Sequence, residues 1–548
     1  MPKHLVQGTI SFSVTNLPVT LELELPEPAP EPEPDVGWAY AILGTSTPCD
    51  GLDGPGLTLQ AQQGVFDLPA SLAGLPERTD LQAQLDAAQD VCELEPGIYR
   101  CSATIGHPLE VRGQQRVSIR ASDDWSPGGT CEWTTSGGAW ISSLRVPDWP
   151  PETLQPFEAR DAWRAGRAWI VMLDGVRQYI EPTTGTVPSA GHFQLDNDRV
   201  ILPLNPAGHL VEVSVRGGAG AWLNVTVDGV VLDGIDFRHA PSGLARWNAL
   251  ESNGRQITYR GCMFGWTHGY GPAPGGSRGS VSESCVYHNS GIGGLGGPNM
   301  HGLVLRNAVL FNNGFGEGWA RENGSGGCKV ISSNDVTFEN TAAFHNNFAG
   351  LWTDIDCRTS SLLNNCCWDN GAMQIHYEIS EDGSLVDNVV FRTEHFSTPQ
   401  ERTLGIYISS SRQVHVGHNL AMHLPSAYEI RWTERGDQPA GGCNGIVHED
   451  CIAIGRYQPG TAAGDWGHDF GLAWLDSAGG VLIGDGSNVA RNNRYGYPGP
   501  EPEDRWSDRD TWLDTLAKLQ AVPQIGQGAS YLSDSERLER LARFGLSE

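Results

Sequence analysis

The chain has 548 residues, with 36 Lys and Arg against 65 Asp and Glu, so its formal net charge at pH 7 is −29. Such an acidic chain repels nucleic-acid phosphates and anionic lipids, which argues against a nucleic-acid-binding protein. Its 69 glycines and three lysines argue against an all-helical protein. No stretch approaches the ~20 apolar residues of a membrane-spanning helix, and residues 1–25 lack the pattern of a secretory signal.

The first part of the chain predicts a small β module followed by a linker. Residues 8–25 alternate apolar with polar or small residues over much of their length, which is the pattern of half-buried strands. We therefore expect an N-terminal β module over residues 1–25. Residues 26–36 are rich in Pro and Glu, which favours an extended polyproline II spacer.

The next two regions differ in composition. Residues 79–89 predict a short helix with capping residues at its start, and a strand-like segment follows at 94–99. The first coil of a solenoid exposes an apolar cross-section, so we expect residues 37–124 to form the entry region and N-terminal cap of a solenoid. Residues 125–220 are rich in Trp and Pro and are expected to form an inserted β subdomain.

From about residue 225 one motif recurs, an apolar strand followed by a polar or small slot residue, a small residue and an apolar residue. Successive slots are 23 to 33 residues apart, so a unit of about 23 residues is kept while insertions lengthen some turns. A coil of this length with three short strands predicts an all-β right-handed parallel β-helix over residues 221–502, in which slot Asn side chains form a ladder. The slot residues are Gly234, Gly261, Ser284, Asn307, Asn340, Asn365, Asn388, Asn419 and Asp450.

The cysteines test that register. Cys262, Cys285, Cys366 and Cys451 each follow a slot residue, which predicts one interior column of small apolar side chains rather than disulfides. No CxxC pairs with another CxxC or with spaced His, so no metal site is predicted.

The end of the chain predicts a helical cap. Residues 503–548 contain two segments with helical spacing of apolar residues, and these can cover the last coil. They show no sustained heptads, so the sequence does not require a homotrimer, although a homotrimer is one possible state.

The later strands of three successive coils, within residues 350–411, carry an unusual set of side chains. Residues two apart in a strand share a face, so apolar side chains fall on one face and rings and acids on the other. We expect the second face to be an outward patch open to water. Its ring column contains Trp352, His376 and Tyr407, and its carboxylate column contains Asp354 and Glu378, with Asp356 two residues along.

This patch has the groups that glycoside hydrolysis needs. Neighbouring strands lie ~4.8 Å apart, so the charge on one acid should raise the pKa of the next. Paired carboxyls ~5–5.5 Å apart serve retaining enzymes, and pairs ~6.5–9.5 Å apart serve inverting ones. We predict Asp354, Asp356 and Glu378 as acid, base or nucleophile, with the flat rings stacking on a sugar. The alternative is that acids and hydroxyls merely solvate an exposed strand.

The turn at residues 312–329 could fold over the same face and bring Lys329 and Trp319 to it. A lysine beside carboxylates could neutralise a uronate or act as the base in β-elimination, the chemistry of polysaccharide lyases. Lys329 could equally pair with acids of its own turn at the surface. One coil further along, Trp432 could extend the sugar-binding surface.

No cofactor is predicted for this site. Its three acids, Asp354, Asp356 and Glu378, could hold Ca²⁺ through oxygen atoms, but nothing in the sequence supplies the six or more oxygens that this ion prefers.

Three blocks of the sequence resemble a known family: "GWARENGSGGCKV" at 318–330, "AGLWTDID" at 349–356 and "IHYEIS" at 375–380. Over roughly 90–490 the chain is similar to bacterial right-handed parallel β-helix proteins of the pectate-lyase-like superfamily. That superfamily includes hydrolases, lyases, epimerases and phage tailspikes, so the resemblance implies the fold without the reaction. Its members usually have Glu or Asp at the positions of Asp354, Asp356 and Glu378.

The resemblance also suggests a location. Phage receptor-binding spikes similarly lack an export signal and attach a β-helix through a small N-terminal domain. This implies an extracellular or virion-surface protein whose residues 1–35 contact other assembly proteins and whose solenoid binds, and by hydrolysis degrades, a polysaccharide. Two alternatives stay open, a non-catalytic structural or adhesion protein and a polysaccharide lyase.

Overall fold

The computed structural model divides the chain into two compact units, Met1–Asp35 and Val36–Glu548. In the first unit, β1 (Phe12–Val14) and β2 (Leu17–Val19) form an antiparallel hairpin. The linker predicted at 26–36 lies outside the described residues. These are residues 12–14, 17–19, 74–148, 169–183, 187–216, 223–241, 251–252, 256–271, 278–314, 324–392, 403–433, 442–455, 470–476, 487–497, 506–508, 511–513, 515–522, 524–544 and 546.

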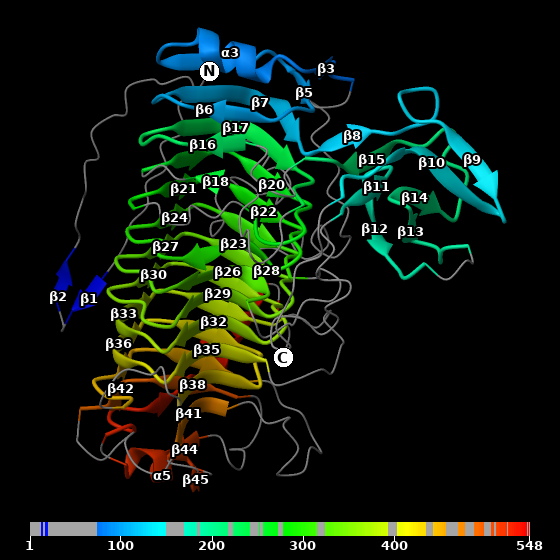
Figure 1. Cartoon of the computed structure of the whole chain (residues 1–548). Coiled ribbons are helices and arrows are strands. Elements are labelled where there is room, and N and C mark those ends of the chain that lie inside the picture. Colours follow the sequence, from blue (N-terminus) through cyan, green and yellow to red (C-terminus); the bar gives the residue numbers. More distant parts are fainter. Residues whose placement is uncertain are drawn as a thin grey trace. The chain divides into compact units, whose positions relative to one another are not determined.

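The second unit contains the predicted right-handed parallel β-helix, in which each coil adds three strands to three parallel stacks (Figure 1). The first stack is β19 (Thr258–Arg260), β21 (Val281–Glu283), β24 (Val304–Arg306), β27 (Thr337–Glu339), β30 (Ser361–Leu363), β33 (Glu381–Val386), β36 (Arg412–Gly417), β39 (Val447–Glu449) and β42 (Val489–Arg491). The second is β20 (Met263–Gly265), β22 (Val286–His288), β25 (Val309–Phe311), β28 (Ala342–Phe344), β31 (Cys366–Trp368), β34 (Val389–Phe391), β37 (Leu420–Met422), β40 (Ile452–Ile454) and β43 (Arg494–Gly496).

The third stack carries the candidate site. It contains β23 (Gly293–Pro298), β26 (Gly326–Ile331), β29 (Ala349–Asp354), β32 (Met373–Glu378), β35 (Leu404–Ser409), β38 (Ser426–Trp432), β41 (Phe470–Asp476), β44 (Trp506–Asp508) and β45 (Thr511–Leu513), with β45 antiparallel to β44.

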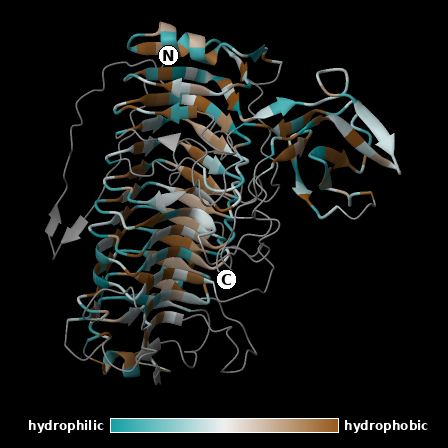
Figure 2. Ribbon diagram, viewed as in Figure 1, coloured by the Kyte–Doolittle hydropathy of each residue, from teal (hydrophilic) through white to brown (hydrophobic). Residues whose placement is uncertain are grey.

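The interior of the solenoid is lined by the same strand positions in coil after coil (Figure 2). In the third stack, Cys328, Leu351, Ile375 and Ile406 are paired in register and fully buried. Burying a Leu or Ile side chain contributes about 1.5–3 kcal/mol, so the repeated apolar position holds the coils together.

The predicted asparagine ladder is confirmed in the middle coils. The backbone N–H of Asn365 donates to Asn388 Oδ1 at 3.0 Å, and that of Asn388 donates to Asn419 Oδ1 at 2.8 Å. The predicted cysteine column holds for Cys262, Cys285 and Cys451, which join the interior cluster. It is wrong for Cys366.

Cys366 lies in a different column because its slot neighbour, Asn365, itself occupies the interior position. The backbone N–H of Thr341 donates to Asn365 Oδ1, and Cys366 pairs with Ala342. Cys366 therefore packs outside the solenoid interior, in a cluster with Phe344 and Trp368. Among the described residues no two cysteines form a disulfide bond.

The two ends of the solenoid are covered in different ways. At the entry, α3 (Leu81–Ala87) places Leu81 and Leu85 on the interior cluster, and at the far end α5 (Leu516–Gln520) does so with Leu519. α6 (Asp534–Arg543) does not join α5, because its Leu541 packs on the outer cluster of the second stack. The entry strands are β3 (Glu77–Arg78), β4 (Val91–Glu93), β5 (Gly97–Tyr99), β6 (Ala103–Ile105), β7 (Glu110–Arg120), β16 (Leu223–Val225), β17 (Val231–Arg238) and β18 (Glu251–Ser252), and β46 (Ser530–Tyr531) closes the far end.

An inserted sheet leaves the solenoid after β7 and returns before β16. Its eight strands run in the order β8 (Ser122–Asp124), β15 (Val211–Ser214), β11 (Val171–Leu173), β12 (Val176–Ile180), β13 (His192–Asp196), β14 (Arg199–Leu202), β10 (Ala139–Arg145) and β9 (Trp133–Ser136). It has its own apolar cluster, which includes Trp125, Trp169 and Phe193.

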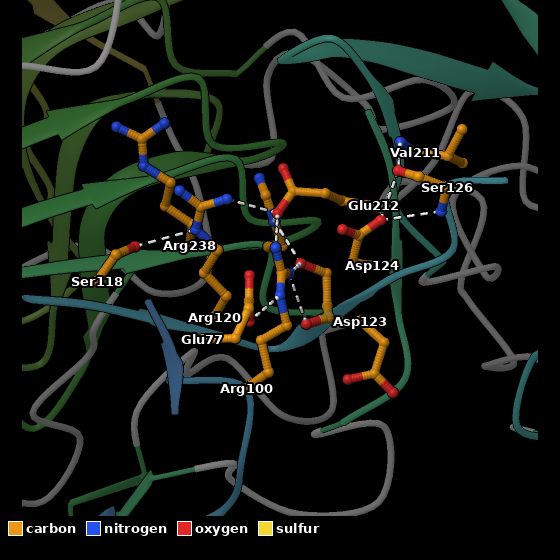
Figure 3. Close-up of polar contacts among 12 residues, drawn as sticks. Glu77, Arg100, Ser118, Arg120, Asp123, Asp124, Ser126, Val211, Glu212 and Arg238 are labelled. Carbon is orange, nitrogen blue, oxygen red and sulfur yellow. Dashed lines mark hydrogen bonds and ion pairs between the residues drawn. The ribbon is translucent and has the colours of Figure 1, made fainter. Parts of the chain in front are cut away.

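A buried ion network joins the inserted sheet to the solenoid (Figure 3). Glu212 of β15 accepts from Arg100 at 2.7 Å and from Arg120 at 2.5 Å, and both arginines come from the entry coils. Arg100 also contacts Glu77 at 2.8 Å. Burial alone would raise the pKa of Glu212, but the surrounding positive charges, including those of Arg120 and Arg100, bring that pKa well below its usual range.

Candidate functional site

The predicted ring column is present on the outer side of the third stack. Strand pairing places Trp352 beside His376 and His376 beside Tyr407. The ring centroids of Trp352 and His376 are 5.1 Å apart and those of His376 and Tyr407 are 4.7 Å apart, and both pairs are stacked. The column continues in both directions, because Trp352 pairs with Lys329 and Tyr407 pairs with Glu429.

This stacking changes what the rings can contact. The ammonium of Lys329 lies 3.5 Å from the centroid of the Trp352 ring, and His376 stacks on Trp352 from the next strand. His376 in turn has Trp352 and Tyr407 on its two sides. The expectation that these ring faces stack on a sugar is therefore wrong for Trp352 and His376, because both faces of each ring are already covered.

The carboxylate column lies beside the rings. Lys329 Nζ is 2.8 Å from Asp354 Oδ2, and Thr353 pairs with Tyr377, which places Asp354 next to Glu378. Burial raises the pKa of Asp354, the charge of Lys329 opposes that rise, and the charge of Glu378 adds to it. The predicted influence of one acid on its neighbour is thus present. His376 Nε2 lies 3.6 Å from Glu378 Oε2.

The expectation of an outward patch open to water is wrong. Asp354 is 4% exposed, Glu378 6% and Tyr407 7%, although these side chains lie on the strand face opposite the interior cluster. Strand alternation correctly separates the two faces, but it carries no information on what other parts of the chain lie above them. Exclusion of water strengthens each charge interaction in the column.

Two predicted residues fall outside this arrangement. β29 ends at Asp354, and the next two residues adopt left-handed conformations (Ile355 φ 41°, Asp356 φ 59°), so the alternation stops there. Asp356 is exposed and pairs with Arg358 at 2.9 Å. Trp432 packs into the interior cluster of the solenoid and not onto the outer face.

Lys329 is bound to Asp354. The acids of its own turn with which it could alternatively pair, Glu317 and Glu322, lie outside the described residues. Trp319 lies outside the described residues.

Two polar atoms of the site have no partner among the described residues. These are the indole Nε1 of Trp352, which is a donor, and Oδ1 of Asp354, which is an acceptor. Both side chains are more than nine-tenths buried. Leaving a buried donor or acceptor unpaired costs about 1–3 kcal/mol, so such atoms mark a place where a ligand or water binds.

Sequence reasoning missed Tyr270, which comes from a turn three coils before β29. Its ring lies over β23, where a Cβ added to Gly293 or Gly296 would approach Tyr270 Cε1 to 2.6 or 2.7 Å. Burial raises the pKa of Tyr270, and the charge of Asp354 adds to the rise, which places this phenol near the acids. The glycine run in β23 was the available signal, because glycine in a strand marks close approach of another group.

The segment at 428–432 extends the site by one strand through residues other than Trp432. Pairing with β35 sets the register and turns Glu429 to the outer face, where it is 1% exposed. Arg431 lies 3.0 Å from Glu429. We refer below to these outer-face residues of the third stack as the outer row: Tyr270, Lys329, Trp352, Asp354, His376, Glu378, Tyr407, Glu429 and Arg431.

In the described parts of the chain, no three His, Cys, Asp or Glu side chains are grouped to hold a metal ion. Among the same residues, no helix has the length and apolar character needed to cross a membrane.

A comparison with protein families supports the fold. A family model described as "Right handed beta helix region" matches residues 248–421. No curated protein matches the sequence. One similar solved structure is the A-module of the Azotobacter vinelandii mannuronan C-5 epimerase AlgE6, with 10% identity, 84% of this chain and 97% of that chain covered, and a TM-score of 0.46.

Two further structures are similar to this chain at the same low level. A complex of XylC with xylose has 10% identity and a TM-score of 0.43, with 78% of this chain and 82% of that chain covered. The tailspike gp49 of Pseudomonas phage LKA1 has 10% identity and a TM-score of 0.29, with 77% of this chain and 72% of that chain covered.

Proposed function

We propose that this protein binds a polysaccharide at the outer row and hydrolyses it, with Asp354 and Glu378 as the reacting carboxyl pair. The observation that carries the proposal is Asp354 itself. One of its oxygens is held by Lys329 at 2.8 Å, the other has no partner among the described residues, and its pKa is raised. A carboxyl group held at one oxygen and open at the other can deliver a proton from a fixed position.

The neighbouring groups complete the chemistry. Asp354 and Glu378 each follow the last paired residues, Thr353 and Tyr377, on neighbouring strands ~4.8 Å apart, which favours the shorter carboxyl separation of retaining hydrolases. A sugar hydroxyl both donates and accepts hydrogen bonds, so it can satisfy the acceptor of Asp354 and the indole donor of Trp352. In this proposal Lys329 is a positioning residue, because its ammonium is already bound to Asp354.

The first test is depolymerisation of a panel of polysaccharides that differ in backbone and charge, measured as new reducing ends. We expect Asp354→Asn and Glu378→Gln to lower the rate by about 10²–10⁴-fold, the usual contribution of a general acid or base. Asp356→Asn is the matched control, because it removes an exposed carboxylate two residues from Asp354 and should retain the wild-type rate.

Each other outcome assigns a different function. Products that absorb in the ultraviolet would indicate β-elimination and identify a lyase. Glycan binding without new reducing ends would identify a non-catalytic binding protein. Equal rates for wild type and Asp354→Asn would remove Asp354 from the reaction.

A further inference from the structure

The inserted sheet also contacts the solenoid outside the Glu212 network. Arg177 of β12 is buried, and its guanidinium extends to the turn that follows β20. Arg177 Nη1 donates to the carbonyl oxygen of Thr267 at 3.3 Å, and Arg177 Nη2 lies 3.4 Å from Nδ1 of His268. A buried guanidinium with two partners on one turn holds that turn against the sheet.

The turn that Arg177 binds also carries Tyr270. The backbone N–H of Gly291, in the next coil, donates to the carbonyl oxygen of Thr267 at 2.9 Å. A Cβ added to Gly291 would overlap the carbonyl oxygen of His268, so the two backbones are in close contact. The position of Tyr270, two residues after His268, is therefore set both by the next coil and by the inserted sheet.

Tyr270 in turn contacts the segment that leads to Lys329. Its hydroxyl donates to the carbonyl oxygen of Gly324 at 3.1 Å. A Cβ added to Gly324 would overlap the Tyr270 hydroxyl and would lie 3.3 Å from Cδ of Lys329, so the phenol and the lysine stem border the same point. Gly324 also has a φ of 125°, so this close approach requires glycine.

Lys329 connects this contact to the candidate site, because its Nζ is 2.8 Å from Asp354 Oδ2. We infer that the inserted sheet positions the outer row through Arg177 and Tyr270. Both are positioning residues, which keep the Lys329 ammonium on Asp354. The effect of this positioning on hydrolysis rests on the proposed function, whereas its effect on the protonation of Asp354 does not.

The pKa of Asp354 reports the positioning without any substrate. It can be followed by carbon NMR of protein labelled at the aspartate carboxyl carbons, with the signal assigned by its loss in Asp354→Asn. The charges of Lys329, Glu378 and His376 all act on this carboxyl group, and that of Lys329 lowers its pKa. Lys329→Met should therefore raise the pKa of Asp354 by about 1–3 units, the usual effect of one close opposite charge, and this sets the upper limit.

Arg177→Met and Tyr270→Phe should each raise the pKa of Asp354 by about half a unit, because the ammonium is then held less closely. Arg145→Met serves as the control. Arg145 belongs to the same sheet and donates to the carbonyl oxygen of Asn197 within that sheet, so its loss should leave the pKa of Asp354 unchanged. No shift in Arg177→Met, or a shift as large in Arg145→Met, would overturn the inference.

A double variant separates positioning from a long-range effect of the lost charge. If Arg177 acts through Tyr270, combining Arg177→Met with Tyr270→Phe should shift the pKa of Asp354 no more than the larger single change does. Shifts that add would mean that Arg177 acts independently of Tyr270, which contradicts the inference. Thermal unfolding identifies a variant that does not fold, and Arg177→Lys, which keeps the charge but has a single nitrogen, then replaces Arg177→Met with the same expected shift.

Hydrolysis is scored separately. If a polysaccharide is cleaved, the pH above which the rate falls should move up with the pKa of Asp354 in Arg177→Met, as expected for a general acid. Cleavage with an unmoved pKa would leave the proposed reaction in place and remove the positioning. A raised pKa without cleavage would remove the reaction and leave the positioning in place.

Discussion

Glu212 at the junction of the inserted sheet and Asp354 in the outer row are buried to a similar extent, at 2% and 4% exposure, yet their surroundings differ. Glu212 is bound by two guanidinium groups, from Arg100 and Arg120. Asp354 has one ammonium and a second carboxylate beside it. As a result, the pKa of Glu212 lies well below its usual range and that of Asp354 lies above it.

This contrast separates two uses of a buried acid. At the junction two arginines bind one acid, Glu212. Their charges favour its ionised form, and the ion pairs hold the inserted sheet on the entry coils. The outer row crowds acids and leaves Asp354 Oδ1 without a described partner, which favours proton exchange with a ligand. Burial alone therefore does not distinguish these two acids; the sign of the pKa shift and the unpaired atom do, and on these grounds we propose Asp354 as a reacting carboxyl group.

The largest expected effect comes from breaking the junction. In Glu212→Gln the buried Arg100 and Arg120 lose their shared anion, and removal of one partner from a buried ion pair costs about 3–5 kcal/mol. Denaturant unfolding should show this loss, and hydrogen exchange should show faster opening of the inserted sheet. A free energy of unfolding within 1 kcal/mol of wild type would refute the junction's structural role.

Acidification is expected to have a smaller effect on the free energy of unfolding, and the contributions of Glu212 and Asp354 should change in opposite directions. Glu212 has a lowered folded pKa, so its stabilisation is present above the ordinary Glu pKa and is lost as the pH falls below it. Asp354 has a raised folded pKa, so its ionisation destabilises the fold at higher pH, and this penalty is relieved as the pH falls through the raised value.

Urea unfolding from pH 7 to pH 3 checks both signs with two variants. The stability difference between wild type and Glu212→Gln should shrink at acid pH. The free energy of unfolding of wild type should increase relative to that of Asp354→Asn as the pH falls. Parallel changes in the two differences would contradict the contrast between these acids.

The smallest effect is expected for Glu77→Gln. Glu77 contacts Arg100 at 2.8 Å, as Glu212 does, but its side chain is 50% exposed. Exposed ion pairs contribute about 0–1 kcal/mol, so thermal unfolding of Glu77→Gln should stay close to wild type. A loss as large as that of Glu212→Gln would mean that the number of partners, and not burial, decides the stability of the junction.

Local periodicity was enough to predict the coils and the ring column. The slot spacing depends on one turn per coil, and the alternation within a strand depends only on backbone geometry, so Trp352, His376 and Tyr407 were placed correctly against one another. The asparagine ladder followed for the same reason. The slip at Cys366 arose because Asn365, like Asn388 and Asn419, occupies the interior position itself.

The rest of the site depends on contacts that periodicity does not carry. Asp356 does not lie in the outer row, because the strand ends at two residues in left-handed conformations. Ile followed by Asp is not a sequence pattern that predicts such a turn. The approach of Tyr270 depends on a turn three coils before β29. The burial of Asp354 does not follow from strand alternation, and burial is the largest cause of its raised pKa.

The way the inserted sheet joins the solenoid has a consequence for evolution. The chain enters through β8 and returns through β15, and these strands pair antiparallel, so Ser122 lies opposite Ser214. Among the described residues between them, Arg177 contacts Thr267 and His268 of the solenoid, but no strand pairs with a coil strand, so a change in length elsewhere in the sheet would leave the winding of the coils intact. Related chains should therefore differ most in the residues between these two strands, where elements can be inserted, lost or exchanged while the coils stay the same.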